Sequence, residues 1–98
     1  GVTVTVTPNP FIDRAGIDIR LGFPRARLRL AVYDRKGRKV KTLLDGVDSG
    51  SKQSTSWNGR DGGGRVPAGP YILMLEALDR DSGHVHTSRT VIVRAARL

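Results

Sequence analysis

Two histidines lie two positions apart, at His84 and His86, and residues at this spacing share one face of a strand. Paired imidazoles bind zinc or copper, but a competent site needs a third and a fourth ligand. The carboxylates nearest in sequence, Asp79 and Asp81, flank a turn signal, where aspartates accept hydrogen bonds from their own backbone. We therefore expect a solvent-facing strand surface at the histidines and no metal site.

A glycine-rich segment, residues 58–65, contains Asn58 and Asp61. Consecutive backbone N–H groups can cradle an anion, but a phosphate-binding loop continues into a helix with a Lys-Ser or Lys-Thr pair. Here a strand pattern follows instead. Asn58 and Asp61 also lack the spacing of a helix–loop–helix calcium site. We expect a tight connection between strands, with no cofactor and no metal ion.

Residues that could act in acid–base or nucleophilic catalysis are few. None of the serines lies in a Gly-x-Ser-x-Gly elbow. The single glutamate, Glu76, lies in an apolar segment, where we expect it to face solvent or to pair with an arginine. The absence of cysteine removes thiolate nucleophiles, thiolate metal sites and disulfides. We therefore expect a protein that is not an enzyme.

Basic residues are concentrated between positions 20 and 41, where nine of them accompany one acid, Asp34. This segment carries a charge of +8, equal to the formal net charge of the whole chain. Arg27 and Arg29 alternate along one predicted strand, and Lys39 and Lys41 along the next. If the two strands pair in phase, the four side chains share one face and form a binding patch for an anionic partner.

If this patch binds an anionic partner, the class that we expect is a surface glycan. Nucleic acid is disfavoured, because readers of single strands place exposed aromatic rings among their basic residues. The five aromatic residues do not interleave with the arginines; they are Phe11, Phe23, Tyr33, Trp57 and Tyr71. A second interpretation is a solvated strand face whose lysines protect a sheet edge. We expect Trp57 to anchor the core or its rim.

Strand patterns must position these residues, because apolar and polar residues alternate along most of the chain and no stretch has a helical period. We expect strands at residues 2–7, 17–21, 28–32, 38–44, 52–57, 71–78 and 84–94, and a turn at 45–50. Segment 71–78 is expected to be a central strand covered on both faces, and Val91 and Val93 share a face of the last strand. The spacing predicts an all-β antiparallel sandwich of about seven strands, with a barrel as the alternative.

The chain of 98 residues has the size of one domain, residues 1–98, and no apolar run approaches the roughly 20 residues that span a membrane. Because the sequence begins directly in a strand pattern, we expect a module of a longer protein.

Several segments, taken together in their order and spacing, resemble one family. They are Pro8 to Phe11, Leu30 to Val40, Leu43-Leu44, Trp57 to Asp61, Val66 to Gly69, and Tyr71. This pattern resembles the FlgD-like immunoglobulin-like domain, named after the flagellar hook-capping protein, and the related C-terminal sorting domains of type IX secretion cargo. The similarity runs from about residue 8 to residue 94.

The resemblance implies an immunoglobulin-like, fibronectin-III-like sandwich at the C-terminus of a larger secreted bacterial protein. It implies a non-catalytic sorting or cell-surface attachment domain, which contacts the export machinery and is located outside the bacterial outer membrane. Residues 90–94 are similar to the family's final basic strand, and residues 95–98 form a short tail. The alternatives are a passive assembly module or spacer, as in a hook cap or a multidomain enzyme, and a module that binds anionic glycan.

Overall fold

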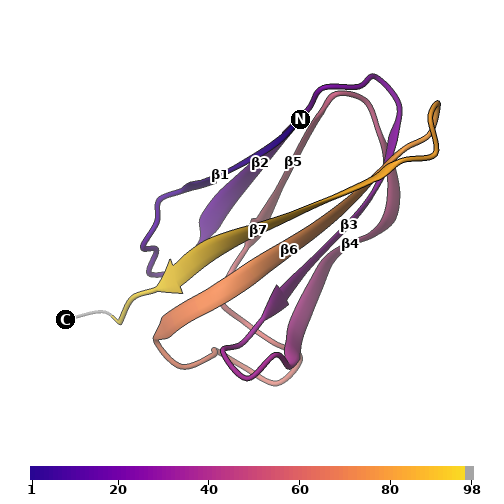
Figure 1. Cartoon of the computed structure of the whole chain (residues 1–98). Helices are drawn as coiled ribbons and strands as arrows, with labels where there is room; N and C mark the ends of the chain where they lie inside the picture. Colours follow the sequence, from indigo (N-terminus) through magenta and orange to yellow (C-terminus); the bar gives the residue numbers. More distant parts are fainter. Residues whose placement is uncertain (97–98) are drawn as a thin grey trace.

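The computed structural model describes residues 1–96, which form seven strands joined by turns and loops (Figure 1). The strands are β1 (Val2–Thr7), β2 (Ala15–Leu21), β3 (Ala26–Tyr33), β4 (Lys39–Ser49), β5 (Lys52–Trp57), β6 (Gly69–Asp79) and β7 (Val85–Arg94). Within this described part of the chain there is no helix that is long and apolar enough to cross a membrane.

The strands form two antiparallel sheets, ordered β1-β2-β5 and β4-β3-β6-β7, which face each other as two layers (Figure 1). This arrangement confirms the predicted seven-stranded β-sandwich. The alternation of apolar and polar residues explains it, because each strand turns one row of side chains toward the facing sheet.

The core lies between the layers and is built from these inward-facing rows together with a cluster of rings. Trp57, at the end of β5, is 1% exposed, and its ring lies 5.5 Å from the ring of Phe11 and 5.4 Å from that of Tyr71. The Trp57 indole N–H donates to the carbonyl oxygen of Arg60 at 2.9 Å. Trp57 is therefore the core anchor that the sequence predicts.

Strand β6 is central, between β3 and β7, but only its inner face is covered. Its inner row is buried, whereas Ile72 and Met74 on the outer face are half-buried and Glu76 is exposed. The prediction that both faces are covered was therefore wrong. No layer packs on the outer side, so the apolar residues of that row remain in partial contact with water.

Strand β7 turns Ile92, which is fully buried, toward the core. The pair Val91 and Val93 shares a face, as expected, but it is the outer face, and Val91 is 51% exposed. Of the expected tail, residues 97–98 lie outside the described residues.

Candidate functional site

The first half of the predicted basic patch is neutralised by acids of the neighbouring strand. Arg27 and Arg29 of β3 pair in register with Asp48 and Asp45 of β4. The Arg27 Nε lies 3.3 Å from Asp48 Oδ1, and the Arg29 guanidinium lies 3.5 Å from Asp45 Oδ1. These acids lie in the segment expected to be a turn, which instead continues β4 to Ser49.

The second half of the patch lies at the opposite end of the β3–β4 ladder. Lys39 pairs with Tyr33, whereas Lys41 pairs with Val32, a residue whose side chain is buried in the core. The expectation that all four basic residues share one face was therefore wrong for Lys41. Whether these residues bind a partner stays a prediction.

Irregularities in β4 explain this placement. The β3–β4 register shifts three times, and the skipped residues on β4 are Val40, Leu43 and Gly46. Each such β-bulge adds one residue to one strand, which reverses the facing of the residues beyond it. Gly46 has a φ of +65°, a conformation that favours glycine.

The unpaired positive charge of the hairpin is therefore found around its turn. Arg35, Lys36, Lys39 and Lys41 are exposed and form no ion pair with any residue in the described part of the chain. Like charges held this close attract a polyanion or an acidic protein surface.

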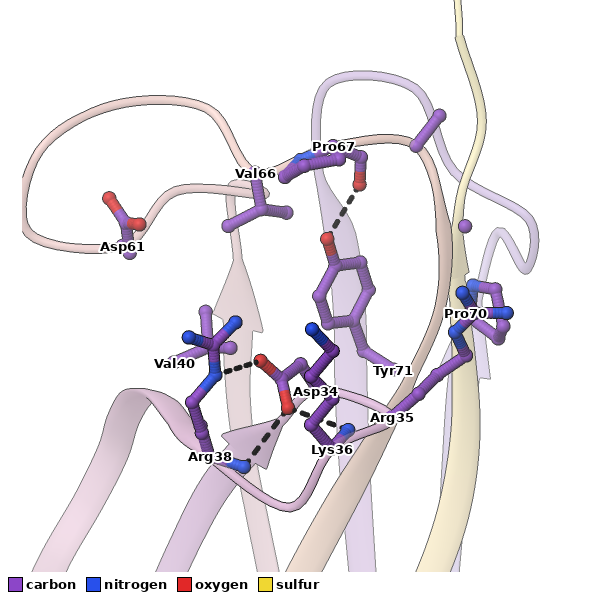
Figure 2. Close-up of a pocket in the computed structure, with 12 residues that line it drawn as sticks. Asp34, Arg35, Lys36, Arg38, Val40, Asp61, Val66, Pro67, Pro70 and Tyr71 are labelled. Atoms are coloured by element: carbon purple, nitrogen blue, oxygen red, sulfur yellow. Dashed lines mark hydrogen bonds and ion pairs between the residues drawn. The ribbon is translucent and has the colours of Figure 1, made fainter.

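The turn itself is held by Asp34 (Figure 2). Its carboxylate accepts the backbone N–H groups of Lys36 at 2.9 Å and Arg38 at 3.0 Å, and the Arg38 Nε–H at 3.0 Å. The backbone N–H of Arg38, followed by the Arg38 side chain and the N–H of Lys36, holds the pKa of Asp34 below its ordinary value. Asp34 is thus a charged structural cap.

A hollow of about 490 Å³, here called the turn-end hollow, lies between this turn and the segment leading into β6 (Figure 2). Its apolar lining includes Val40, Val66, Pro67, Pro70 and Tyr71. Its charged lining consists of Asp34, Arg35, Lys36, Arg38 and Asp61. The arrangement offers an apolar floor and a mostly cationic rim.

The glycine-rich loop forms one wall of the turn-end hollow. Asp61 accepts hydrogen bonds from the N–H groups of Gly63 at 2.7 Å and Gly64 at 2.9 Å, and these bonds lower the pKa of Asp61. Arg60 and Arg65 form an isolated bridge that closes the loop. The expected tight connection is confirmed, and Asp61, like Asp34, is engaged by its own turn.

The histidines lie at the other end of the sandwich. The ring of His86 stacks on Phe23 with centroids 5.0 Å apart, and His84 packs edge-on against His86 at 4.5 Å. Asp79 accepts the N–H groups of Asp81 and Ser82 within its turn. Within residues 1–96, no three His, Asp or Glu side chains gather as a metal-binding group.

Sequence reasoning missed the residues that decide the charge distribution. Asp45 and Asp48 sit three positions apart, and a regular strand would place them on opposite faces. The bulge at Gly46 brings both beside the arginines. The sequence signal of this bulge is Gly46, a glycine inside a strand between Asp45 and Asp48.

Two sheets of three and four antiparallel strands define an immunoglobulin-like β-sandwich. No protein-family model matches the chain, and no curated protein sequence matches it. Among solved structures, the chain is similar to dimeric latent PorU from Porphyromonas gingivalis, with a TM-score of 0.77 and 21% identity over 98% of this chain and 9% of that one. It is also similar to CopC from Methylosinus trichosporium OB3b, with a TM-score of 0.68 and 12% identity over 100% of this chain and 97% of that one. At these identities the likeness is one of fold.

Proposed function

We propose that the chain is a non-catalytic module that sorts or attaches a larger secreted bacterial protein to the cell surface through contacts with the export machinery. The observation that carries this proposal is the match of 98% of the chain to a segment that makes up 9% of PorU. In PorU, therefore, a fold of this kind is one unit of a much longer chain, which supports a similar use for this module. The sequence resemblance to type IX sorting domains points to the same use.

The chemistry of the turn-end hollow supports a binding role. Both acids in its lining, Asp34 and Asp61, accept hydrogen bonds from their own turns and have lowered pKa values. A carboxylate held in this way is a poor general base, because its basicity is reduced. Arg38 is engaged by Asp34, whereas Arg35 and Lys36 form no ion pair within residues 1–96 and can contact an acidic partner.

A fusion experiment tests the proposal. The 98-residue chain is joined to the C-terminus of a periplasmic reporter enzyme in a bacterium with a type IX secretion system. We expect reporter activity on the cell surface or in the medium, and an intact-mass measurement of the exported reporter determines whether the module is removed. The matched control carries the module at the N-terminus of the reporter.

If the reporter stays in the periplasm with the C-terminal fusion as well as with the N-terminal control, the sorting function is contradicted. That result would favour the second candidate, a passive structural module. The observation favouring that candidate is the likeness to CopC, 97% of which is spanned by this chain. The fold thus also forms nearly the whole of a small protein. A spacer would leave secretion unchanged when deleted.

A further inference from the structure

The outer face of the four-stranded sheet is divided into two chemically different halves. Strand pairing places Tyr33 beside Ile72 and Ile72 beside Val91, so that these three form one row across β3, β6 and β7. The next row contains Ala31, Met74 and Arg89. Apart from Arg89, this half, nearest the β3–β4 turn, is apolar: Ala31 is buried, Ile72 and Met74 are half-buried, and Val91 is exposed.

The next row along the same face is charged and internally matched. Arg29 pairs in register with Asp45 on one side and with Glu76 on the other. The Arg29 guanidinium contacts Asp45 Oδ1 at 3.5 Å. In this half, therefore, the arginines of β3 are paired with the aspartates of β4.

The apolar half is hollowed and carries unmatched cations. An open hollow of about 630 Å³, here called the sheet-face hollow, has Tyr33, Ile72 and Met74 among its lining residues. Its charged lining consists of Arg35, Arg89 and Asp34, and the carboxylate of Asp34 is already engaged by its own turn and by Arg38. Arg35 and Arg89 are exposed and form no ion pair with any residue from 1 to 96. Arg35 lines the turn-end hollow as well, so it stands where the two hollows meet.

We propose that the sheet-face hollow binds an acidic segment of a partner protein, with an apolar side chain over Ile72 and Met74 and carboxylates against Arg35 and Arg89. The inference rests on the proposed function for its biological role and names the class of partner. Guanidinium groups bind carboxylates through paired hydrogen bonds, and covering the half-buried apolar row removes it from water. A polyanionic glycan matches the cations but has no apolar side chain for the floor.

The experiment measures the fluorescence anisotropy of a short labelled peptide, made of glutamates with one central leucine, as the 98-residue chain is added. We expect binding that weakens as salt is raised, because exposed charges are screened. Replacing the leucine of the peptide with alanine should weaken binding about tenfold, since apolar contact area is lost. A peptide with lysines in place of the glutamates should not bind.

Variants of the chain locate the site. Arg35→Glu together with Arg89→Glu should weaken binding of the leucine peptide at least tenfold. Arg20→Glu together with Lys52→Glu is the matched control, because it changes the net charge equally at two exposed neighbours on the other sheet. Ile72→Thr should weaken binding severalfold and keep a β-branched residue in β6.

Equal weakening by both charge-reversal pairs would overturn the proposal, because the attraction would then be to the whole molecule. It would also be overturned if polygalacturonate bound at this face while the leucine peptide did not. Failure of export in the fusion experiment leaves the peptide affinity intact, whereas successful export without peptide binding contradicts this inference alone.

Discussion

The hydroxyl of Tyr71 donates a 2.6 Å hydrogen bond to the carbonyl oxygen of Pro67, four residues earlier in the chain. A tyrosine hydroxyl is protonated at neutral pH and so acts as a donor there, and burial raises the pKa of Tyr71 further. The bond joins the start of β6 to the loop before it, as the tyrosine corner does in other β-sandwiches. It therefore fixes the floor of the turn-end hollow (Figure 2).

Replacing Tyr71 with phenylalanine removes this hydrogen bond and leaves the ring in place. We expect the free energy of unfolding to fall by about 1 kcal/mol, which corresponds to a Tm lower by roughly 4–8 °C in a domain of this size. Urea denaturation followed by Trp57 fluorescence measures the change. Tyr33→Phe is the control, because the Tyr33 hydroxyl has no hydrogen bond to the described residues, and an equal loss there would contradict the assignment.

Gly59 is buried against the side chains of Phe11 and Arg94. Its φ is +71°, and a Cβ added there would lie 3.2 Å from Arg94 Cδ and 3.3 Å from Phe11 Cε2. We expect Gly59→Ala to lower the free energy of unfolding by about 1–2 kcal/mol, because alanine is strained at this φ and its neighbours must move. Gly62→Ala, a change in the same loop with open space around it, should be nearly neutral. Similar unfolding midpoints in urea for the two variants would refute this reasoning.

The fold was predictable because its information is local. Alternation in Val2–Thr7 and in residues 28–32 determines which side chains enter the core, and the observed strands keep this pattern except at Ala31, which is buried on the outer face. The exposure of the outer face of β6 was harder to predict. A run of apolar residues from 71 to 75 is expected to be covered on both sides, and only the completed sheet order leaves Ile72 and Met74 without a layer above them.

The candidate site was less predictable, because it depends on register. Bulges at Val40, Leu43 and Gly46 change which residues of β4 meet β3, and an assignment that assumes regular alternation along each strand does not include them. For this reason Arg27 was assigned to an open patch, although it pairs with Asp48. The placement of Arg89 depends on the sheet order instead, because β7 lies far from the hairpin in sequence and reaches this face only through its pairing with β6.

The two halves of the predicted basic patch should respond differently to charge reversal. Arg27→Glu with Arg29→Glu replaces two ion pairs with repulsion from Asp48 and Asp45, and we expect a loss of about 1–2 kcal/mol in the free energy of unfolding. The same reversal at residues 39 and 41 breaks no ion pair, and the repulsion that it relieves around the turn offsets the lost attraction between Lys41 and Asp61, so stability should be nearly unchanged. Urea titrations at low salt and at about 1 M salt measure both effects, and the difference should shrink in high salt. Equal losses in the two variants would contradict the observed pairing.

Acid should destabilise the domain through the aspartates that close its turns. Hydrogen bonds from backbone N–H groups, first that of Arg38 for Asp34 and that of Gly63 for Asp61, lower both pKa values from 3.8. A carboxyl group with a lowered folded-state pKa contributes stability above its unfolded-state pKa, and this contribution is lost as the pH falls through the folded-state value. We therefore expect the contribution of these turns to be constant above about pH 5 and to fall below about pH 4.

Urea midpoints measured from pH 2 to pH 7 test this expectation. Asp34→Asn keeps a carbonyl oxygen to accept the turn's N–H groups but has no titrating proton, so it should be less stable at pH 7 and should lose less stability on acidification. The difference between Asp34→Asn and the unaltered chain should be largest at neutral pH and should close as the carboxyl group becomes protonated. A difference in urea midpoint that stays constant from pH 2 to pH 7 would show that the charge of Asp34 does not stabilise the turn. The description of Asp34 as a charged cap at the turn-end hollow would then be wrong.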